Sequence, residues 1–222
     1  VAVGDATSMG NGIANDDHVT TSKIAGITDL DISGLTISDA TGIEDFIALQ
    51  NLNCFNNSLS SIDLSRNVAL QILAIGRNNL TSLDLSQNTA LTFVSCLRNQ
   101  ITDLNVSQNI MLETLGCSNN QLSNLDVTNN PALKTLSFYS NPMGSIDVTQ
   151  NSLLENLDCV DAQLTVLDVT QNPELIELQA YDNSLTSLDL SNNVKLVELF
   201  IEDNQITSLD VSNNTVLEDL SC

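Results

Sequence analysis

Three stretches of the chain repeat one another with a period of 21 residues. Residues 79–99 read NLTSLDLSQNTALTFVSCLRN, residues 100–120 read QITDLNVSQNIMLETLGCSNN, and residues 184–204 read SLTSLDLSNNVKLVELFIEDN. Counted from the first residue of each copy, positions 2, 5, 7, 13, 16 and 18 are apolar or cysteine. Self-similarity at a fixed period of this size is typical of repeat architectures, so we take the 21-residue repeat as the structural unit of the chain.

The same register extends to both sides of these copies. The segment 48–57 fits positions 12 to 21, and no insertion interrupts the register from Ala48 to Cys222. All five cysteines take position 18, at residues 54, 96, 117, 159 and 222. Full copies start at residues 58, 79, 100, 121, 142, 163 and 184, and a shortened copy starts at residue 205.

Each copy predicts one short β-strand. The apolar positions 16 and 18 alternate with variable positions 15, 17 and 19, which is the period of a strand. Positions 5 and 7 also alternate, which predicts a second short strand or an extended turn on the opposite wall. No copy has a helical apolar pattern longer than one turn. The sequence therefore predicts a mainly β solenoid of eight to nine coils, stacked about 4.8 Å apart, in which each coil contacts only its neighbours.

The segment L-x-x-L-x-C-x-x-N-x-L in these copies resembles the leucine-rich-repeat signature. With its 21-residue length and its cysteine column, the repeat is similar to the internalin J branch of bacterial repeats and to repeats of secreted Bacteroidota proteins. The resemblance implies a right-handed superhelix with a parallel sheet on its concave side and short extended or turn segments on its convex side. It also implies a secreted or cell-surface protein that serves adhesion or partner binding and has no enzymatic activity.

The repeat divides the chain into three parts. Residues 1–26 are rich in Gly, Asn and Asp and predict an N-terminal cap, residues 27–57 form an irregular first repeat, and residues 58–222 form the regular array. The array ends on a predicted strand, so we expect more protein to follow it. The cap holds an oxygen-rich cluster that fits a solvated surface better than an ion site, because its spacing does not match an EF-hand loop: Asp5, Asn11, Asn15, Asp16 and Asp17.

The composition excludes several classes of protein. The chain has 28 acidic and 6 basic residues, a formal net charge of −22, which disfavours electrostatic binding of nucleic acid. Its apolar runs are far shorter than the roughly 20 residues that a bilayer-spanning helix needs, so we expect no direct insertion into a membrane. The single histidine, His18, leaves little for a histidine-based catalytic triad or a multi-histidine metal site. We predict no catalytic residues and no cofactor.

The cysteine column is predicted to be part of the core. Small buried thiols behave as hydrophobic residues, and other copies place Ile75, Phe138 or Ala180 at this position. A disulfide between Cys96 and Cys117 is the alternative, but in-register parallel strands suit the bridging torsion poorly. We therefore predict five free thiols, with all but Cys222 buried.

Two polar columns are predicted to support the backbone. Position 10 is Asn in all eight copies, and position 21 is Asn except at Ala162, where we predict a gap in the hydrogen bonding. Position 6 is Asp in seven copies and Asn105 in the other, always followed by Ser or Thr at position 8. Hydrogen bonds to that Ser or Thr and to turn N–H groups explain the acidic column. A column of Ca²⁺ sites is the alternative, which Asn105 and the lack of glycine-rich turns disfavour.

Positions 15, 17, 19 and 20 vary between copies, and the resemblance places them on the concave surface. Five of the seven aromatic residues gather at these positions, and the charge there is divided between a basic half and an acidic half. Such a surface is typical of a binding face. The predicted ligand-binding residues are Phe55, Arg77, Phe93, Arg98, Tyr139, Asp158, Asp161, Glu177, Tyr181, Asp182, Glu198, Phe200, Glu202 and Asp203.

The favoured function is that of a monomeric recognition module in a larger chain, which binds a protein partner through this face. Glycan binding is an alternative, because the aromatic rings could stack on sugars beside carboxylates. A passive spacer is a second alternative, with the variation of the face explained as drift. Glu198 and Glu202 resemble the carboxylate couple of a hydrolase, but no cleft is implied around them.

Overall fold

The computed structural model describes residues 21–222, so most of the predicted N-terminal cap, with its oxygen-rich cluster and His18, lies outside the described residues. A short helix, α1 (Thr21–Ile24), leads into the first strand, and a 3-10 helix, η1 (Ile43–Asp45), follows that strand. None of the described helices has the length and hydropathy that a membrane crossing needs. The strands are β1 (Asp29–Asp31), β2 (Asn51–Asn53), β3 (Ile72–Ala74), β4 (Phe93–Ser95), β5 (Thr114–Gly116), β6 (Thr135–Ser137), β7 (Asn156–Asp158), β8 (Glu177–Gln179), β9 (Glu198–Phe200) and β10 (Asp219–Ser221).

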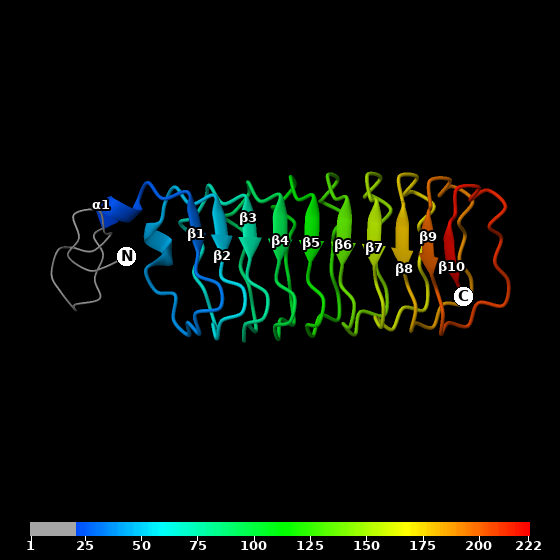
Figure 1. The fold of residues 1–222 in the computed structure, drawn as a ribbon, viewed down its shortest axis with the longest axis horizontal. Helices are drawn as coiled ribbons and strands as arrows, with labels where there is room; N and C mark the ends of the chain where they lie inside the picture. The colour runs from blue at the N-terminus through cyan, green and yellow to red at the C-terminus, as the bar shows by residue number, and fades with distance from the viewer. Residues whose placement is uncertain (1–20) are drawn as a thin grey trace.

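These strands form one parallel sheet in chain order, β1 to β10, along the long axis of the molecule (Figure 1). From β2 onward each step of the pairing is 21 residues, as between Leu73 of β3 and Val94 of β4. The first step is 22 residues, from Leu30 to Leu52, because the first turn holds the extra helix η1. The predicted mainly β solenoid of eight to nine coils is confirmed.

The core is one continuous cluster that runs through all the coils. From β2 to β9 the middle residue of each strand points inward and is buried, while the two residues beside it are partly exposed, except for Ile72, which is exposed. The alternation at positions 5 and 7 produces extended turns, the second of the two predicted outcomes, since the described strands all belong to the single sheet. In a typical coil the N–H of Asn88 donates to the carbonyl of Leu85, at 3.1 Å, and closes such a turn.

Two asparagine columns bind the coils together. At position 21, Asn99 accepts from the N–H of Leu80 at 3.0 Å and donates to the carbonyls of Cys96 at 3.0 Å and Ile75 at 3.1 Å. One side chain thus closes its own coil and joins it to the preceding one. At position 10, the Nδ2 of Asn88 donates to two carbonyls of the preceding coil, at 3.0 Å and 2.9 Å. Each pattern recurs along the array, which confirms the predicted backbone role.

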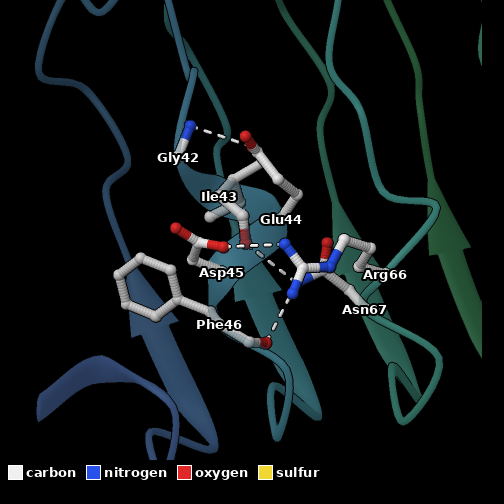
Figure 2. A network of polar contacts seen from close by, with 7 residues as sticks. All are labelled: Gly42, Ile43, Glu44, Asp45, Phe46, Arg66 and Asn67. Carbon is white, nitrogen blue, oxygen red and sulfur yellow. Dashed lines mark hydrogen bonds and ion pairs between the residues drawn. The ribbon is translucent and has the colours of Figure 1, made fainter. Parts of the chain in front are cut away.

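The position-10 column begins at the irregular first repeat (Figure 2). There Asn67 donates to the carbonyls of Ile43 at 2.9 Å and Phe46 at 3.0 Å, which belong to η1 and to the residue after it. The adjacent Arg66 forms an ion pair with Asp45 at 2.8 Å. The same asparagine that stacks two regular coils therefore also fixes the irregular turn to the array.

Ala162 leaves the predicted gap in the position-21 column. In the regular pattern, the side-chain oxygen of an asparagine at position 162 would accept a hydrogen bond from the N–H of Met143. Here that N–H donates instead to the carbonyl of Asn141, at 2.8 Å. The surrounding turns differ from those of other coils, because Gly144 and Gln163 have positive φ angles of 73° and 59°. The backbone has thus rearranged to satisfy the group that the missing side chain left without a partner.

Replacing Asn120 by alanine tests how much one asparagine of the position-21 column contributes to stability. We expect Asn120→Ala to lower the free energy of unfolding by about 3 kcal/mol, because it leaves the buried N–H of Ile101 without an acceptor. Chemical denaturation followed by circular dichroism measures the change. The exposed Gln100→Ala is the control and should stay within about 0.5 kcal/mol of the parent. Equal stability of the two variants would contradict the stabilising role of the position-21 asparagine column.

The thiol prediction holds in the structure, where all five cysteines are free and only Cys222 is exposed. Burial raises the pKa of the Cys54 and Cys96 thiols to about 12, so they stay protonated and unreactive in the folded protein. A thiol reagent at about pH 8 should therefore label one group in the native protein and five under denaturing, non-reducing conditions. A denatured count of one or three would show that the cysteine column forms disulfides.

Candidate interaction face

Positions 15, 17, 19 and 20 of the coils together form what is called here the sheet face. Positions 15 and 17 flank the inward-pointing residue of each strand, so their side chains stand on the outer surface of the sheet. Positions 19 and 20 follow the strand and extend this surface along one edge. None of the fourteen residues predicted to bind a ligand is buried. Five of them flank the inward-pointing residue of a strand, and the other nine lie at positions 19 and 20, directly after a strand: the five are Phe93, Asp158, Glu177, Glu198 and Phe200.

Position 20 adopts a left-handed backbone in each coil from Asn56 to Asp203, with φ between 49° and 59°. Asn and Asp tolerate this conformation better than most residues, and five of the eight residues at position 20 are Asn or Asp: Asn56, Asn119, Asp161, Asp182 and Asp203. Arg77 and Arg98 take the same conformation at φ 54°. The turn therefore fixes a row of side chains along the edge of the sheet face, and the five charged ones among them are exposed: Arg77, Arg98, Asp161, Asp182 and Asp203.

The basic half of the face contains an internal contact that sequence analysis did not separate from the other aromatic residues. The guanidinium carbon of Arg77 lies 5.6 Å from the centroid of the Phe55 ring, a cation–π geometry. Gly76 makes this possible, since a Cβ atom there would lie 3.2 Å from Cδ2 of Phe55 and 2.9 Å from the carbonyl oxygen of Leu97. Phe55 and Arg77 thus form a pair already engaged with each other.

Asp158, on β7, is the carboxylate of the face with the clearest electrostatic signature. Its Oδ2 accepts from the Ser137 hydroxyl at 2.9 Å, and that hydroxyl lies 2.7 Å from the Ser118 hydroxyl. Burial raises the pKa of the Asp158 carboxyl, and the nearby Glu177 raises it further. Glu177 itself accepts a hydrogen bond from Gln179. Two neighbouring acids are therefore supported by neutral donors.

An open hollow of about 280 Å³ lies over β6, β7 and β8 and includes both acids. Sequence analysis identified Asp158 and Glu177 but missed the other polar residues of its lining. The short polar side chains at positions 15 and 17 of these coils could have indicated a polar hollow. The size of that hollow, however, depends on how the neighbouring strands align, which the sequence does not state. The missed polar lining residues are Thr135, Ser137, Asn156 and Gln179.

The acidic half of the face carries no basic residue. From Asn156 to Ser221 its positions hold eight acids and no Lys or Arg. Lys134 and Lys195 lie off the face and form ion pairs with glutamates of neighbouring coils. One carboxylate oxygen of Glu202 is buried and accepts no hydrogen bond from the described residues. The acids of this half are thus not neutralised by cations of the described chain.

The acidic column at position 6 lies away from the sheet face and has a structural role. Asp147 accepts from the N–H of Thr149 at 2.9 Å and from its hydroxyl at 2.7 Å, and the other column members make the same backbone contact. Asn105 replaces the carboxylate with an amide oxygen that accepts from Ser107 at 3.0 Å. In residues 21–222 no group of three His, Cys, Asp or Glu side chains is placed to hold a metal ion. The predicted hydrogen-bonding role of this column is confirmed.

The comparisons with known proteins agree with this geometry. The functional domain of InlJ from Listeria monocytogenes, described as including a cysteine ladder, matches with a TM-score of 0.82 and 35% identity over 88% of this chain. The chain has the leucine-rich-repeat fold. It resembles the cysteine-ladder internalins, as the sequence indicated, and it spans 46% of the InlJ structure. No protein-family model matches the chain, and no curated protein sequence does.

Two further solved structures place the fold in a wider group. An internalin, InlF, from Listeria monocytogenes has a TM-score of 0.72 and 26% identity, covering 91% of this chain and 68% of its own. The Arabidopsis receptor kinase HAESA, solved with the peptide hormone IDA and the co-receptor SERK1, has a TM-score of 0.71 and 20% identity, covering 81% and 35%. At that identity HAESA shows a shared fold alone.

The acidic column generates a prediction about low pH. Hydrogen bonds from Thr128, Thr149 and Thr170 lower the pKa of Asp126, Asp147 and Asp168. A carboxylate whose pKa is lower in the folded state stabilises the fold above its unfolded pKa, and this contribution is lost as the pH falls through the folded pKa. The melting temperature should therefore fall below about pH 4, and it should fall less in the triple Asp→Asn variant of this column.

Thermal unfolding followed by circular dichroism from pH 7 to pH 2 measures this difference. A second triple variant, Asp182→Asn with Asp203→Asn and Glu218→Gln, removes the same charge from exposed sites outside the column. If both triple variants followed the same curve against pH, the effect would come from net charge and not from the turn hydrogen bonds.

Proposed function

We propose that the chain is a non-enzymatic recognition module of a secreted or surface-exposed bacterial protein and that it binds a protein partner through the sheet face. One observation carries the proposal: aromatic and charged residues vary from coil to coil on this face, whereas the position-6 column repeats a single Asp-x-Ser/Thr turn. A partner surface does not repeat every 21 residues, so a binding face should vary. Solenoids use such extended surfaces for binding.

The relatives support protein binding as the class of function. The receptor kinase HAESA, which shares this fold, was solved in complex with a peptide hormone and a co-receptor. The net charge of −22 continues to disfavour nucleic acid as a partner.

Glycan binding is the second candidate, and one observation favours it. Tyr181 and Phe200 are partly exposed at positions of the face whose coils also carry the carboxylates of Asp182 and Glu202, an arrangement that can stack on a sugar ring and bind its hydroxyls. A glycan array and a panel of extracellular proteins, probed in parallel with the same labelled chain, separate the two candidates. Binding in neither assay would leave the spacer interpretation.

Two pairs of aromatic residues test the face once a partner is in hand. We expect Phe93→Ala with Tyr139→Ala, or Tyr181→Ala with Phe200→Ala, to weaken binding at least about tenfold, because aromatic anchors commonly contribute about 2 kcal/mol or more. Surface plasmon resonance measures the affinity, and circular dichroism confirms folding.

The matched control replaces two exposed apolar residues outside the face, Ile110→Ala with Val166→Ala, and should bind like the parent. If both aromatic pairs also bound like the parent, the partner would not use the sheet face.

A further inference from the structure

We propose that the hollow over β6, β7 and β8 receives an arginine side chain of the partner. This inference rests on the binding through the sheet face proposed above, and it names the group that anchors the partner to the acidic half.

The hollow follows from the register of three strands. Ser137, Asp158 and Gln179 face one another across the sheet at position 17, and Thr135, Asn156 and Glu177 do so at position 15. Parallel strands about 4.8 Å apart hold these six side chains as two rows of three. The shorter members leave a space of about 280 Å³, with Asp158 and Glu177 at diagonal places in its lining.

The two carboxylates have neutral partners only. Asp158 accepts from the Ser137 hydroxyl at 2.9 Å and, at the longer distance of 3.5 Å, from the N–H of Val160. Glu177 accepts from the neutral amide of Gln179. None of the ion pairs in residues 21–222 includes either acid. Partly buried carboxylates without a counter-charge are costly, and burial raises the pKa of Asp158 for this reason, so a cation is the group that the hollow favours.

The size and lining of the hollow select among cations. Its volume of about 280 Å³ lies just below the range of about 300–1,000 Å³ typical of small-molecule pockets, so a single side chain suits it. The planar guanidinium can donate to two carboxylates at once and is more weakly hydrated than the lysine ammonium. A metal ion fits less well, because no group of three His, Cys, Asp or Glu side chains in residues 21–222 is placed to hold one.

An NMR titration tests the inference without the natural partner. The ¹⁵N-labelled chain is titrated with the blocked peptide acetyl-Gly-Arg-Gly-amide, and in parallel with the same peptide carrying citrulline or lysine. We expect amide shifts confined to β6, β7 and β8, with a dissociation constant on the order of 1 mM for the arginine peptide. Citrulline, which lacks the charge, should bind at least about tenfold more weakly, and lysine should lie between the two.

Conservative variants locate the site. Asp158→Asn and Glu177→Gln keep the side-chain shape and should each weaken binding of the arginine peptide about tenfold, while Glu218→Gln, at an exposed acid outside the sheet face, should not. The amide spectrum of each variant reports whether it folds. Shifts spread equally over the acidic edge, equal binding of citrulline, tighter binding of lysine or no shift at all would each overturn the inference.

The two proposals fail separately. If the aromatic pairs weaken partner binding but the arginine peptide ignores the hollow, the sheet face stands and the anchor is wrong. If the peptide binds the hollow but neither aromatic pair affects the partner, the hollow stands as a site and the proposed binding face is wrong.

Discussion

The structure depends on satisfying the backbone groups that stacking buries between coils. A 21-residue coil has no room for a helix on its second side, so its turns leave carbonyls pointing at the neighbouring coil. Asparagine meets this need at position 10 as a donor: Nδ2 of Asn88 serves two carbonyls, while its Oδ1 accepts no hydrogen bond from the described residues. An aspartate of the same shape would offer only acceptors, which explains why this column is never acidic in a chain so rich in acids.

Because the interior fixes the backbone, most of the fold could be predicted from the period alone. The positions of the strands, the core, the thiols and the asparagine columns, and the gap at Ala162, all follow from residue types that recur at fixed positions of the 21-residue repeat. The second wall shows the limit of this reasoning. Alternation at positions 5 and 7 fits a strand and an extended turn equally well. In the structure these positions lead into a turn that a hydrogen bond closes, such as that from the N–H of Asn88 to the carbonyl of Leu85. A pattern of apolar residues does not specify such a bond.

The candidate site was predictable as a surface but not as a set of contacts. All fourteen predicted residues lie on the sheet face, yet Phe55 is held by Arg77, and the hollow at Asp158 depends on residues that sequence analysis passed over. A side chain's availability depends on the lengths of its neighbours one coil away. Gly76 and Ser137 are important because their small size leaves space beside Phe55 and Asp158. A motif does not show the space that a small residue leaves.

Rigidity gives the acidic half its chemical character. On a mobile loop, carboxylates such as Asp158 and Glu177 would separate and solvate, and their mutual repulsion would be small. Here each acid stands on a strand paired on both sides, so the repulsion and the partial desolvation remain in the folded state. A cation that enters the hollow offsets the repulsion by its attraction to both acids, without any rearrangement of the backbone. The regular coil thus holds charges in place before a partner arrives, and the interaction that organises the core, asparagine to backbone, is the one that keeps the face ready to bind.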